Sequence, residues 1–154
     1  MLRIKERMPH AFIGVDLIVG ARGETPERFE ASRQFIDSLP VSHLHVFDYS
    51  ERPGTRALDI EYAVDNAEKH RRSAEMIELS ARKHAEFAAQ FTGTVRPVLL
   101  EHPVGDKPLG GFTDNYLRVE AAVDPAYDNT IQPMRLDTLL DDGETFVATL
   151  ANKP

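Results

Sequence analysis

The stretch FIGVDLIV, Phe12 to Val19, decides the fold of the first part of this chain. It is an almost continuous apolar run, which is typical of a strand covered on both faces, as in a parallel sheet flanked by helices. Gly20 to Gly23 form a turn, and Thr25 followed by Pro26 favours a helix start, because the hydroxyl can cap the helix and proline needs no hydrogen bond there. We therefore expect a strand that leads directly into a helix.

The next segment completes a strand-helix-strand unit. Helical spacing predicts a helix over about Pro26 to Ser38, which ends before Pro40, with these residues on its buried side: Phe29, Ser32, Ile36 and Leu39. A second β-rich run, His43 to Phe47, follows at once. Because the connections are short, we expect the two strands to be parallel neighbours.

A long loop and a long charged helix come next. Asp48 to Ala63 has little periodicity, and Asp65 with Glu68 forms a capping box that begins the helix. Apolar residues then recur at spacings of three and four, which predicts packing along one narrow stripe made of Ile77, Ala81, His84, Ala88 and Phe91.

Beyond Phe91 the chain changes to short strands separated by turn residues, which indicates a small antiparallel barrel or sandwich. The candidate strands are Thr94 to Glu101, Gly110 to Thr113, Tyr116 to Ala121, Thr130 to Leu136 and Thr145 to Leu150. We therefore expect two domains, residues 1–91 and 92–154.

Composition excludes several classes of protein. The 154 residues include no Cys, so this chain cannot hold disulfides, use thiolate catalysis or ligate an iron-sulfur cluster through thiolates. A net charge of −7 argues against a general electrostatic grip on nucleic acid or an anionic membrane. The N-terminus is charged and no apolar run reaches the ~20 residues of a membrane span, so we expect a soluble cytoplasmic protein.

The first β-rich segments contain polar residues that could carry chemistry. Asp16 lies inside an apolar strand, and a buried carboxylate needs a partner. His43 and His45 point to the same side of their strand, so a metal-dependent hydrolase using both imidazoles and Asp16 is one alternative. Ordinary packing of the two histidines is the more frequent outcome. The glycines between the first strand and the helix could admit an anionic ligand or simply form a tight turn.

Two later segments could contact RNA. Arg52 and Arg56 follow the end of a parallel strand, where α/β proteins place their sites, and the alternative is a rigid linker with solvated arginines. The hairpin Gly110 to Val119 offers aromatic, amide, hydroxyl and Arg groups suited to splayed bases. Against this, Gly93 to Pro154 holds five Lys or Arg and ten Asp or Glu, a net charge of −5, so an ordinary turn with Tyr116 packed in the barrel is the alternative.

In this order, the segments DLIVGARGET (16–25), LHVFDYSERPGT (44–55) and GGFTDNYLRV (110–119) resemble the C-terminal portion of the radical S-adenosylmethionine tRNA methylthiotransferases. They most resemble the branch that acts on threonylcarbamoyladenosine next to the tRNA anticodon. The resemblance covers almost the whole chain. It departs from the family at Ala21-Arg22, which replace Phe-Pro, and at Asp48 and Glu51, which replace Pro.

The resemblance implies an α/β segment, the last βαβ part of a partial α/β barrel, then a long helix and a small OB-like barrel, the RNA-binding TRAM domain. The implied cofactor-binding residues are Asp16, Ile18, Gly20, Val46 and Phe47. The implied RNA-binding residues are Arg52, Thr55, Arg56, Thr113, Asn115, Tyr116 and Arg118.

The implied activity is methylthiolation of threonylcarbamoyladenosine in tRNA, with S-adenosylmethionine and two 4Fe-4S clusters as cofactors of the full enzyme. Because the cluster cysteines are absent, we expect a fragment that is inactive alone, binds no cofactor alone and partners the missing N-terminal part of the enzyme. Unpaired strand edges also predict a tendency to self-associate. The alternative is a stand-alone RNA-binding or assembly protein without catalysis.

Overall fold

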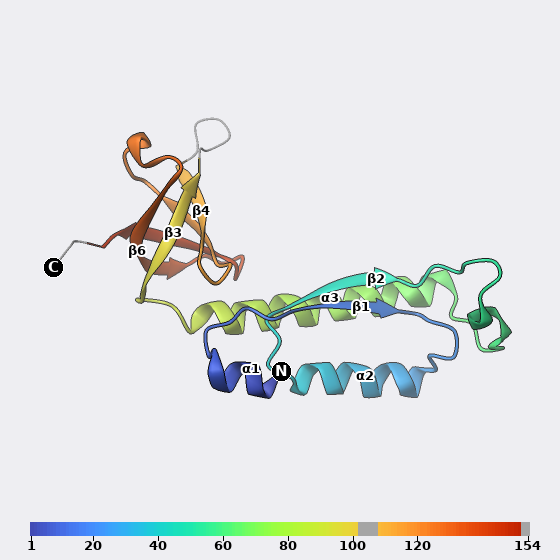
Figure 1. Cartoon of the computed structure of the whole chain (residues 1–154). Coiled ribbons are helices and arrows are strands. Elements are labelled where there is room, and N and C mark those ends of the chain that lie inside the picture. Colours follow the sequence, from blue (N-terminus) through green and yellow to red (C-terminus); the bar gives the residue numbers. More distant parts are fainter. Residues whose placement is uncertain (102–107, 152–154) are drawn as a thin grey trace. The chain divides into compact units, whose positions relative to one another are not determined.

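The computed structural model describes residues 1–101 and 108–151, and the chain divides into two compact units, residues 1–83 and 84–154 (Figure 1). Within those described ranges, no helix combines the length and apolar character needed to cross a bilayer.

The first unit is built around a strand-helix-strand motif. Strands β1 and β2 form a two-stranded parallel sheet in which Gly14 pairs with His43 and Ile18 with Phe47, which confirms the predicted motif. Its elements are α1 (Leu2–Arg7), β1 (Gly14–Val19), α2 (Pro26–Ser38), β2 (His43–Asp48), the 3-10 helix η1 (Arg56–Asp59) and α3 (Asn66–Ala89), which continues into the second unit.

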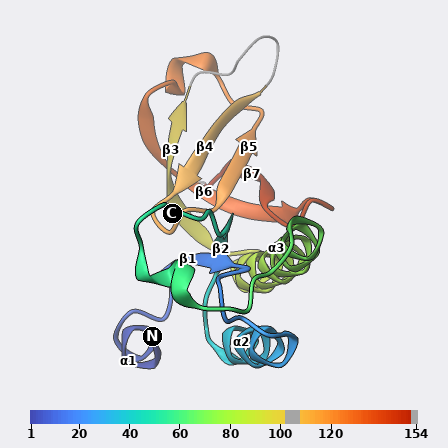
Figure 2. The same cartoon turned by 90° about the vertical axis from the view of Figure 1, so that its right-hand side faces the viewer.

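Helix α2 packs against one face of this sheet, and α3 lies along the β2 edge, where the Leu44 amide donates to the Ser80 hydroxyl at 2.8 Å (Figures 1 and 2). Thr25 caps α2 as expected, because its hydroxyl accepts a hydrogen bond from the Arg28 amide at 3.4 Å and Pro26 occupies the first turn. The core between the sheet and the helices consists of Val19, Phe29, Ile36, Val41, Leu44, Met76 and Leu79. The two helices thereby fix where the two strand ends lie.

The prediction that both faces of β1 are covered was wrong. Leu17 and Val19 turn toward the helices, whereas Asp16 and Ile18 turn away and are exposed in the part of the chain that the structure describes. The exposed fractions are 58% for Ile18 and 54% for Phe47, its partner in β2. An apolar run favours burial of both faces, but it does not show whether residues of the same chain cover the second face. Since Asp16 is exposed, its carboxylate needs no buried partner.

Helix α3 begins as predicted, but only the last part of the predicted stripe, Ala88 and Phe91, is buried. Asp65 accepts a hydrogen bond from the Glu68 amide at 2.9 Å. Ile77 is 56% exposed, and the buried side instead contains Arg72 and Lys83 among the apolar residues. The Lys83 ammonium donates to the carbonyls of Asp37 and Leu39 at 2.6 and 2.9 Å, at the end of α2. A prediction from the spacing of apolar residues therefore missed these two charged side chains, whose aliphatic parts pack inside.

The second unit contains a closed five-stranded barrel with strand order β3-β4-β5-β7-β6 (Figure 2). The sequence predicted an antiparallel barrel, but the barrel is mixed because β5 and β7 pair in parallel. Its elements are β3 (Val95–Glu101), β4 (Leu109–Thr113), β5 (Arg118–Ala121), η2 (Pro125–Tyr127), β6 (Thr130–Leu139) and β7 (Thr145–Leu150). Its fully buried core includes Val98, Leu100, Leu117, Val119, Met134, Leu136 and Phe146.

Candidate cofactor and RNA-binding site

The carboxyl ends of β1 and β2 lie next to a pocket of about 370 Å³. This edge of a parallel sheet is where α/β proteins bind ligands. The pocket brings Ile18, expected to face a cofactor, together with Arg52 and Thr55, expected to face RNA. Its lining is Ile18, Asp48, Tyr49, Ser50, Arg52, Thr55 and Ala57.

The five expected cofactor residues occupy three different environments. Asp16, Ile18 and Phe47 share the open face of the sheet, where the Ile18 and Phe47 side chains form an exposed apolar pair. Val46 lies opposite Leu17 on the other face and packs against the core. Gly20 lies just beyond the end of β1 and is buried.

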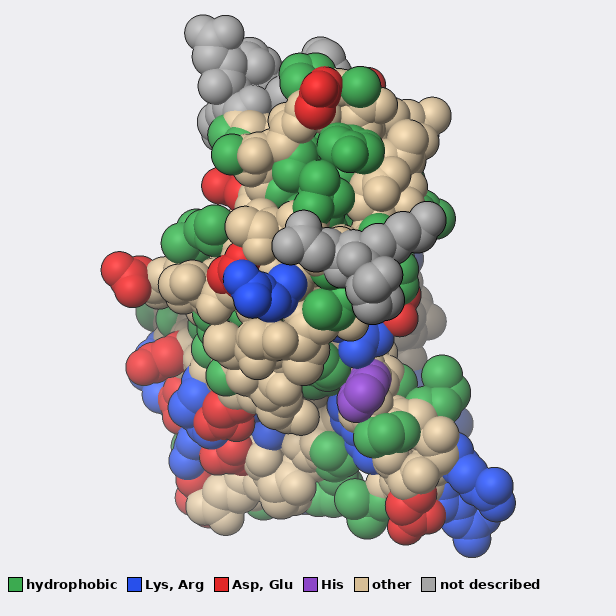
Figure 3. All heavy atoms as spheres, turned by 90° about the vertical axis from the view of Figure 1, so that its left-hand side faces the viewer, with side chains coloured by type: hydrophobic (Ala, Val, Ile, Leu, Met, Phe, Trp, Pro, Cys, Tyr) green, Lys and Arg blue, Asp and Glu red, His purple; other side chains and the backbone are tan. Residues whose placement is uncertain are grey.

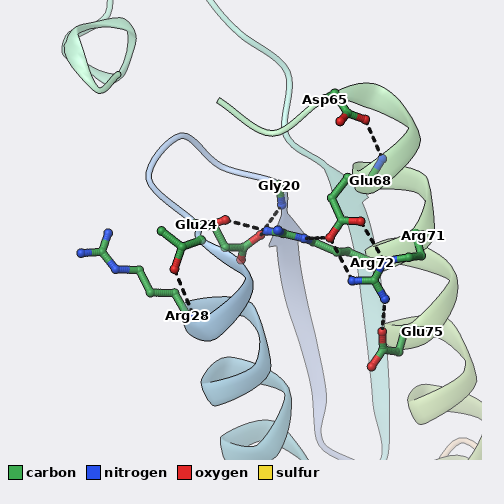
Figure 4. Close-up of polar contacts among 9 residues, drawn as sticks. Gly20, Glu24, Arg28, Asp65, Glu68, Arg71, Arg72 and Glu75 are labelled. Atoms are coloured by element: carbon green, nitrogen blue, oxygen red, sulfur yellow. Dashed lines mark hydrogen bonds and ion pairs between the residues drawn. The ribbon is translucent and has the colours of Figure 1, made fainter. Parts of the chain in front are cut away.

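The turn at Gly20 is held by a polar network from α3 (Figure 4). Gly20 has a φ of +76°, and its amide donates to Glu24 Oε2 at 2.6 Å. The Arg72 side chain, which has no exposed surface, donates from Nη1 to Glu24 Oε2 at 2.9 Å and to the Glu24 carbonyl at 2.7 Å. Sequence reasoning missed Arg72, because one arginine in a charged helix gives no signal of burial.

Three further side chains of α3 reach the strand ends. A Cβ on Gly20 would come within 2.4 Å of Lys69 Cγ, and the Lys69 ammonium donates to the Tyr49 carbonyl at 3.2 Å. The Asp48 carboxylate accepts a hydrogen bond from the Ser73 hydroxyl and lies 3.0 Å from His70 Nδ1. The first turns of α3 therefore contact both strand ends that border the pocket.

The loop after β2 is held at its base and presents free guanidinium groups. Arg22 Nε pairs with Glu51 at 2.7 Å, and this hydrogen bond lowers the pKa of the Glu51 carboxyl. The Thr55 hydroxyl donates to the Arg52 carbonyl at 2.8 Å, which stabilises the turn. Arg52 and Arg56 are exposed and form no ion pair with any described residue, so both can contact phosphate.

The hypothetical metal site has no support in the geometry. His43 and His45 lie together, with ring centroids 4.7 Å apart, and Asp16 pairs with His45 across the sheet. Among residues 1–101 and 108–151, however, no group of three or more His, Asp or Glu residues could hold a metal ion. A hydrolase that uses these three residues is therefore not supported.

The hairpin after β4 buries some of the expected RNA-binding residues and exposes others. The Thr113 hydroxyl donates to Asn115 Oδ1 at 2.6 Å and accepts from the Leu117 amide at 2.9 Å, and both polar side chains are buried. Tyr116 has a φ of 66° and is 72% exposed. The alternative in which Tyr116 packs inside the barrel was wrong. Thr113 and Asn115 shape the hairpin, whereas Tyr116 and Arg118 face solvent.

An exposed apolar row on the barrel was also missed. Leu99 pairs with Phe112 on one side and Ile131 on the other, and all three are at least 40% exposed. The Phe112 and Tyr116 ring centroids are 6.3 Å apart, and Arg118 pairs with Phe112. Hydrophobic side chains are visible on the barrel surface in the upper part of Figure 3. Because side chains alternate between the two faces of a strand, the position of Leu99 between Val98 and Leu100 is the sequence signal that could have revealed this row.

Comparisons with known proteins identify the relatives of the chain. No protein-family model matches it. It is 36% identical over 121 residues to a threonylcarbamoyladenosine tRNA methylthiotransferase of Bacillus subtilis, covering 76% of this chain and 27% of that protein. It is also 36% identical over 115 residues to a tRNA-2-methylthio-N(6)-dimethylallyladenosine synthase of Stenotrophomonas maltophilia, covering 73% of this chain and 24% of that protein.

A third similar protein is the tRNA-2-methylthio-N(6)-dimethylallyladenosine synthase of Corynebacterium urealyticum, with 35% identity over 105 residues, 68% of this chain and 19% of that protein. The chain thus spans about a quarter of the length of the curated relatives it matches. The matched part is their C-terminal region. The chain belongs to the tRNA methylthiotransferase family, with its matched residues corresponding to the C-terminal region of these enzymes.

Proposed function

We propose that this chain provides the RNA-binding and cofactor-facing surfaces of a tRNA methylthiotransferase. In this proposal residues 1–91 form the end of the catalytic α/β domain with its connecting helix, and residues 92–154 form the TRAM barrel. The observation that carries it is the pocket at the strand ends, which places Ile18 beside Arg52 and Thr55. A ligand at the sheet and an RNA at the loop would meet there.

The proposed substrate is threonylcarbamoyladenosine next to the tRNA anticodon. The resemblance of the three segments to that branch and the Bacillus subtilis relative support it. Relatives named for dimethylallyladenosine are equally identical, so any test must compare both nucleosides.

The proposed cofactor surface is the open face of the sheet. An exposed Ile18 and Phe47 pair fits the flat face of an aromatic ring such as adenine, with the Asp16 carboxylate farther along the same face and Gly20 at the strand end. Val46 would support this surface from the core side. S-adenosylmethionine bound there would supply the methyl group and, with an external reductant, the radical chemistry.

Iron-sulfur clusters do not fit the residues of this chain. Their usual ligands are Cys thiolates, and the sequence contains no Cys. In this proposal another polypeptide segment provides both clusters, and the 154 residues alone are catalytically inactive.

The proposed RNA contacts divide into two groups. Arg52 and Arg56 bind phosphate from the loop, whose turn is held by Thr55. On the barrel, Tyr116 stacks on a base and Arg118 binds phosphate, while the buried Thr113 and Asn115 maintain the hairpin. Because the chain carries a net charge of −7, we expect weak and salt-sensitive binding.

RNA binding by the whole chain tests the proposal. We expect an anticodon stem-loop carrying threonylcarbamoyladenosine to bind with a dissociation constant of roughly 10 μM, more tightly than the dimethylallyl and unmodified stem-loops. The double variant Arg52→Ala/Arg56→Ala and the variant Tyr116→Ala should each weaken binding about fivefold, whereas Arg71→Ala, a matched control on exposed α3, should not. No binding at low salt, or equal loss in the control, would contradict the proposal.

A chimera separates catalysis from simple RNA binding. The chain would replace the matched C-terminal region of the Bacillus subtilis relative, and methylthiolated nucleosides in cellular tRNA would be measured by mass spectrometry. We expect the chimera to restore the modification. Binding without any restored modification would instead favour a stand-alone RNA-binding protein.

A further inference from the structure

We propose that α3 holds the ends of β1 and β2 in place beside the pocket and that Arg72 is the positioning residue on this helix. Through Glu24, Arg72 fixes the backbone at Gly20 and so the end of the strand that carries Ile18 into the pocket. The inference rests on the proposed function only in treating this pocket as the binding site.

Arg72 is a buried residue of α3. Its side chain has no exposed surface, and its guanidinium lies 5.0 Å from the centroid of the Phe29 ring. Nε donates to Glu68 Oε1 at 2.8 Å, while Nη1 donates to the side chain and carbonyl of Glu24. Packing and two carboxylates together hold the guanidinium in one orientation.

Glu24 joins Arg72 to the end of β1 (Figure 4). Glu24 Oε2 accepts both Arg72 Nη1 and the Gly20 amide, so one carboxylate oxygen connects α3 to the turn after β1. A carboxylate that lost Arg72 could leave the amide and turn toward water. The Gly20 backbone would then lose the hydrogen bond that holds it at the pocket edge.

Buried ion pairs contribute little net stability, because removing two charges from water offsets their attraction. Arg72 Nη2 is buried without a hydrogen-bond partner among the described residues, which makes the arrangement less favourable still. An arginine held between two carboxylates is therefore better explained by its effect on local geometry than by a contribution to stability.

Neighbouring contacts agree with this role. Lys69 fills the space beside Gly20 and holds the Tyr49 carbonyl, and Ser73 holds the Asp48 carboxylate. Tyr49 and Asp48 both line the pocket. The first turns of α3 thus support the pocket from one side, with Arg72 as the most buried contact.

Amide hydrogen exchange of the whole chain tests the inference directly. We expect Arg72→Met to raise exchange of the amides in residues 18–25 about tenfold, while amides of β2 and the barrel change less than about twofold. Glu24→Gln, which keeps the shape, should raise the same amides about fivefold, and Arg72→Lys should restore part of the protection. The matched control Arg82→Met removes a half-exposed arginine of the same helix, which pairs with Asp37 and not with Glu24 or Glu68, and should change none of them.

Two results would overturn the inference. One is unchanged exchange at residues 18–25 in both Arg72→Met and Glu24→Gln. The other is an equal rise throughout residues 1–83, which would show a general loss of folding rather than a local effect.

RNA affinity separates this inference from the proposed function. If the wild-type chain binds the modified stem-loop, Arg72→Met should weaken binding about threefold and Arg72→Lys should recover it. If the wild-type chain binds no RNA, the proposed function fails, and the exchange experiment still decides the role of Arg72. Full RNA affinity in an Arg72→Met chain with a loosened turn would count against the positioning role.

Discussion

The barrel and the α/β unit bury their apolar side chains in different ways. All five barrel strands have a neighbour on both sides, and the side chains inside are completely buried. The α/β unit has two strands, a core on one face of the sheet, and an exposed Ile18 and Phe47 on the other. The barrel therefore closes on its own core, whereas the α/β unit leaves apolar side chains exposed on one face of its sheet. The candidate pocket belongs to the less complete unit, where local opening costs less.

The largest effect should come from a glycine of the barrel. A Cβ on Gly111 would lie 2.0 Å from the Leu99 carbonyl oxygen, so Gly111→Ala must push β3 and β4 apart. We expect it to lower the free energy of unfolding by about 4 kcal/mol. The control Gly110→Ala places its Cβ 3.5 Å from the nearest atom and should cost less than about 1 kcal/mol. Chemical denaturation, combined with amide exchange in the barrel, measures the loss of stability in both variants. Equal losses in Gly111→Ala and Gly110→Ala would show that β3 and β4 are less tightly packed at Gly111 than the structure indicates.

A core truncation in the α/β unit should come next. Phe29 is 4% exposed and packs under the Arg72 guanidinium, so Phe29→Ala removes apolar packing and a cation-π contact. We expect a loss of about 3 kcal/mol that affects residues 1–83 and leaves barrel exchange unchanged. Phe35→Ala on the same helix, where the ring is 64% exposed, is the control and should stay within about 0.5 kcal/mol. Equal loss in the barrel would mean that the two units unfold together.

Two neighbouring residues of β1 test whether its second face is open. Leu17 packs against the core, so Leu17→Ser should cost about 2 kcal/mol. Ile18 points to the open face, and Ile18→Ser should change unfolding by less than about 0.5 kcal/mol. Thermal denaturation compares the two variants. A large loss for Ile18→Ser would show that another chain or copy covers this face in solution.

The smallest effect concerns acid stability. Hydrogen bonds from Arg71 and Arg72 lower the pKa of the Glu68 carboxyl from 4.5 to about 2. Because the folded pKa is below the unfolded one, this contribution is complete above pH 4.5 and disappears as the pH falls toward 2. Exchange in residues 1–83 should rise over that range, and Glu68→Gln should make the rise shallower. Glu78→Gln, an exposed control on α3, should behave as the wild type.

Much of the local structure could be predicted from short patterns. Thr25 and Pro26 begin α2, and Asp65 caps the start of α3, because capping depends on a few adjacent residues. Turn residues between short strands indicated the barrel, but not its parallel β5 and β7 pair. That pair joins strands distant along the chain, and closure decides it rather than any local pattern.

The candidate site could be predicted only in part. Ile18, Arg52 and Thr55 were named from the sequence and do line one pocket, although their roles there stay predictions. Val46 was named with them but lies on the core side, because a strand turns successive residues to opposite faces. The polar contacts of α3 could not be found, since a charged helix gives no sign of which charge is buried.

By itself, the sequence determined the strand-helix-strand motif, the change to short strands beyond Phe91, the family resemblance and the absence of thiolate ligands. These depend on residue type, local spacing and count. Only the tertiary structure decided which face of β1 is open, which stripe of α3 is buried, and that Arg72 reaches Glu24 from 48 residues away. The physical reason is that burial and ion pairing depend on which distant segments meet, and one strand or one helix does not carry that information.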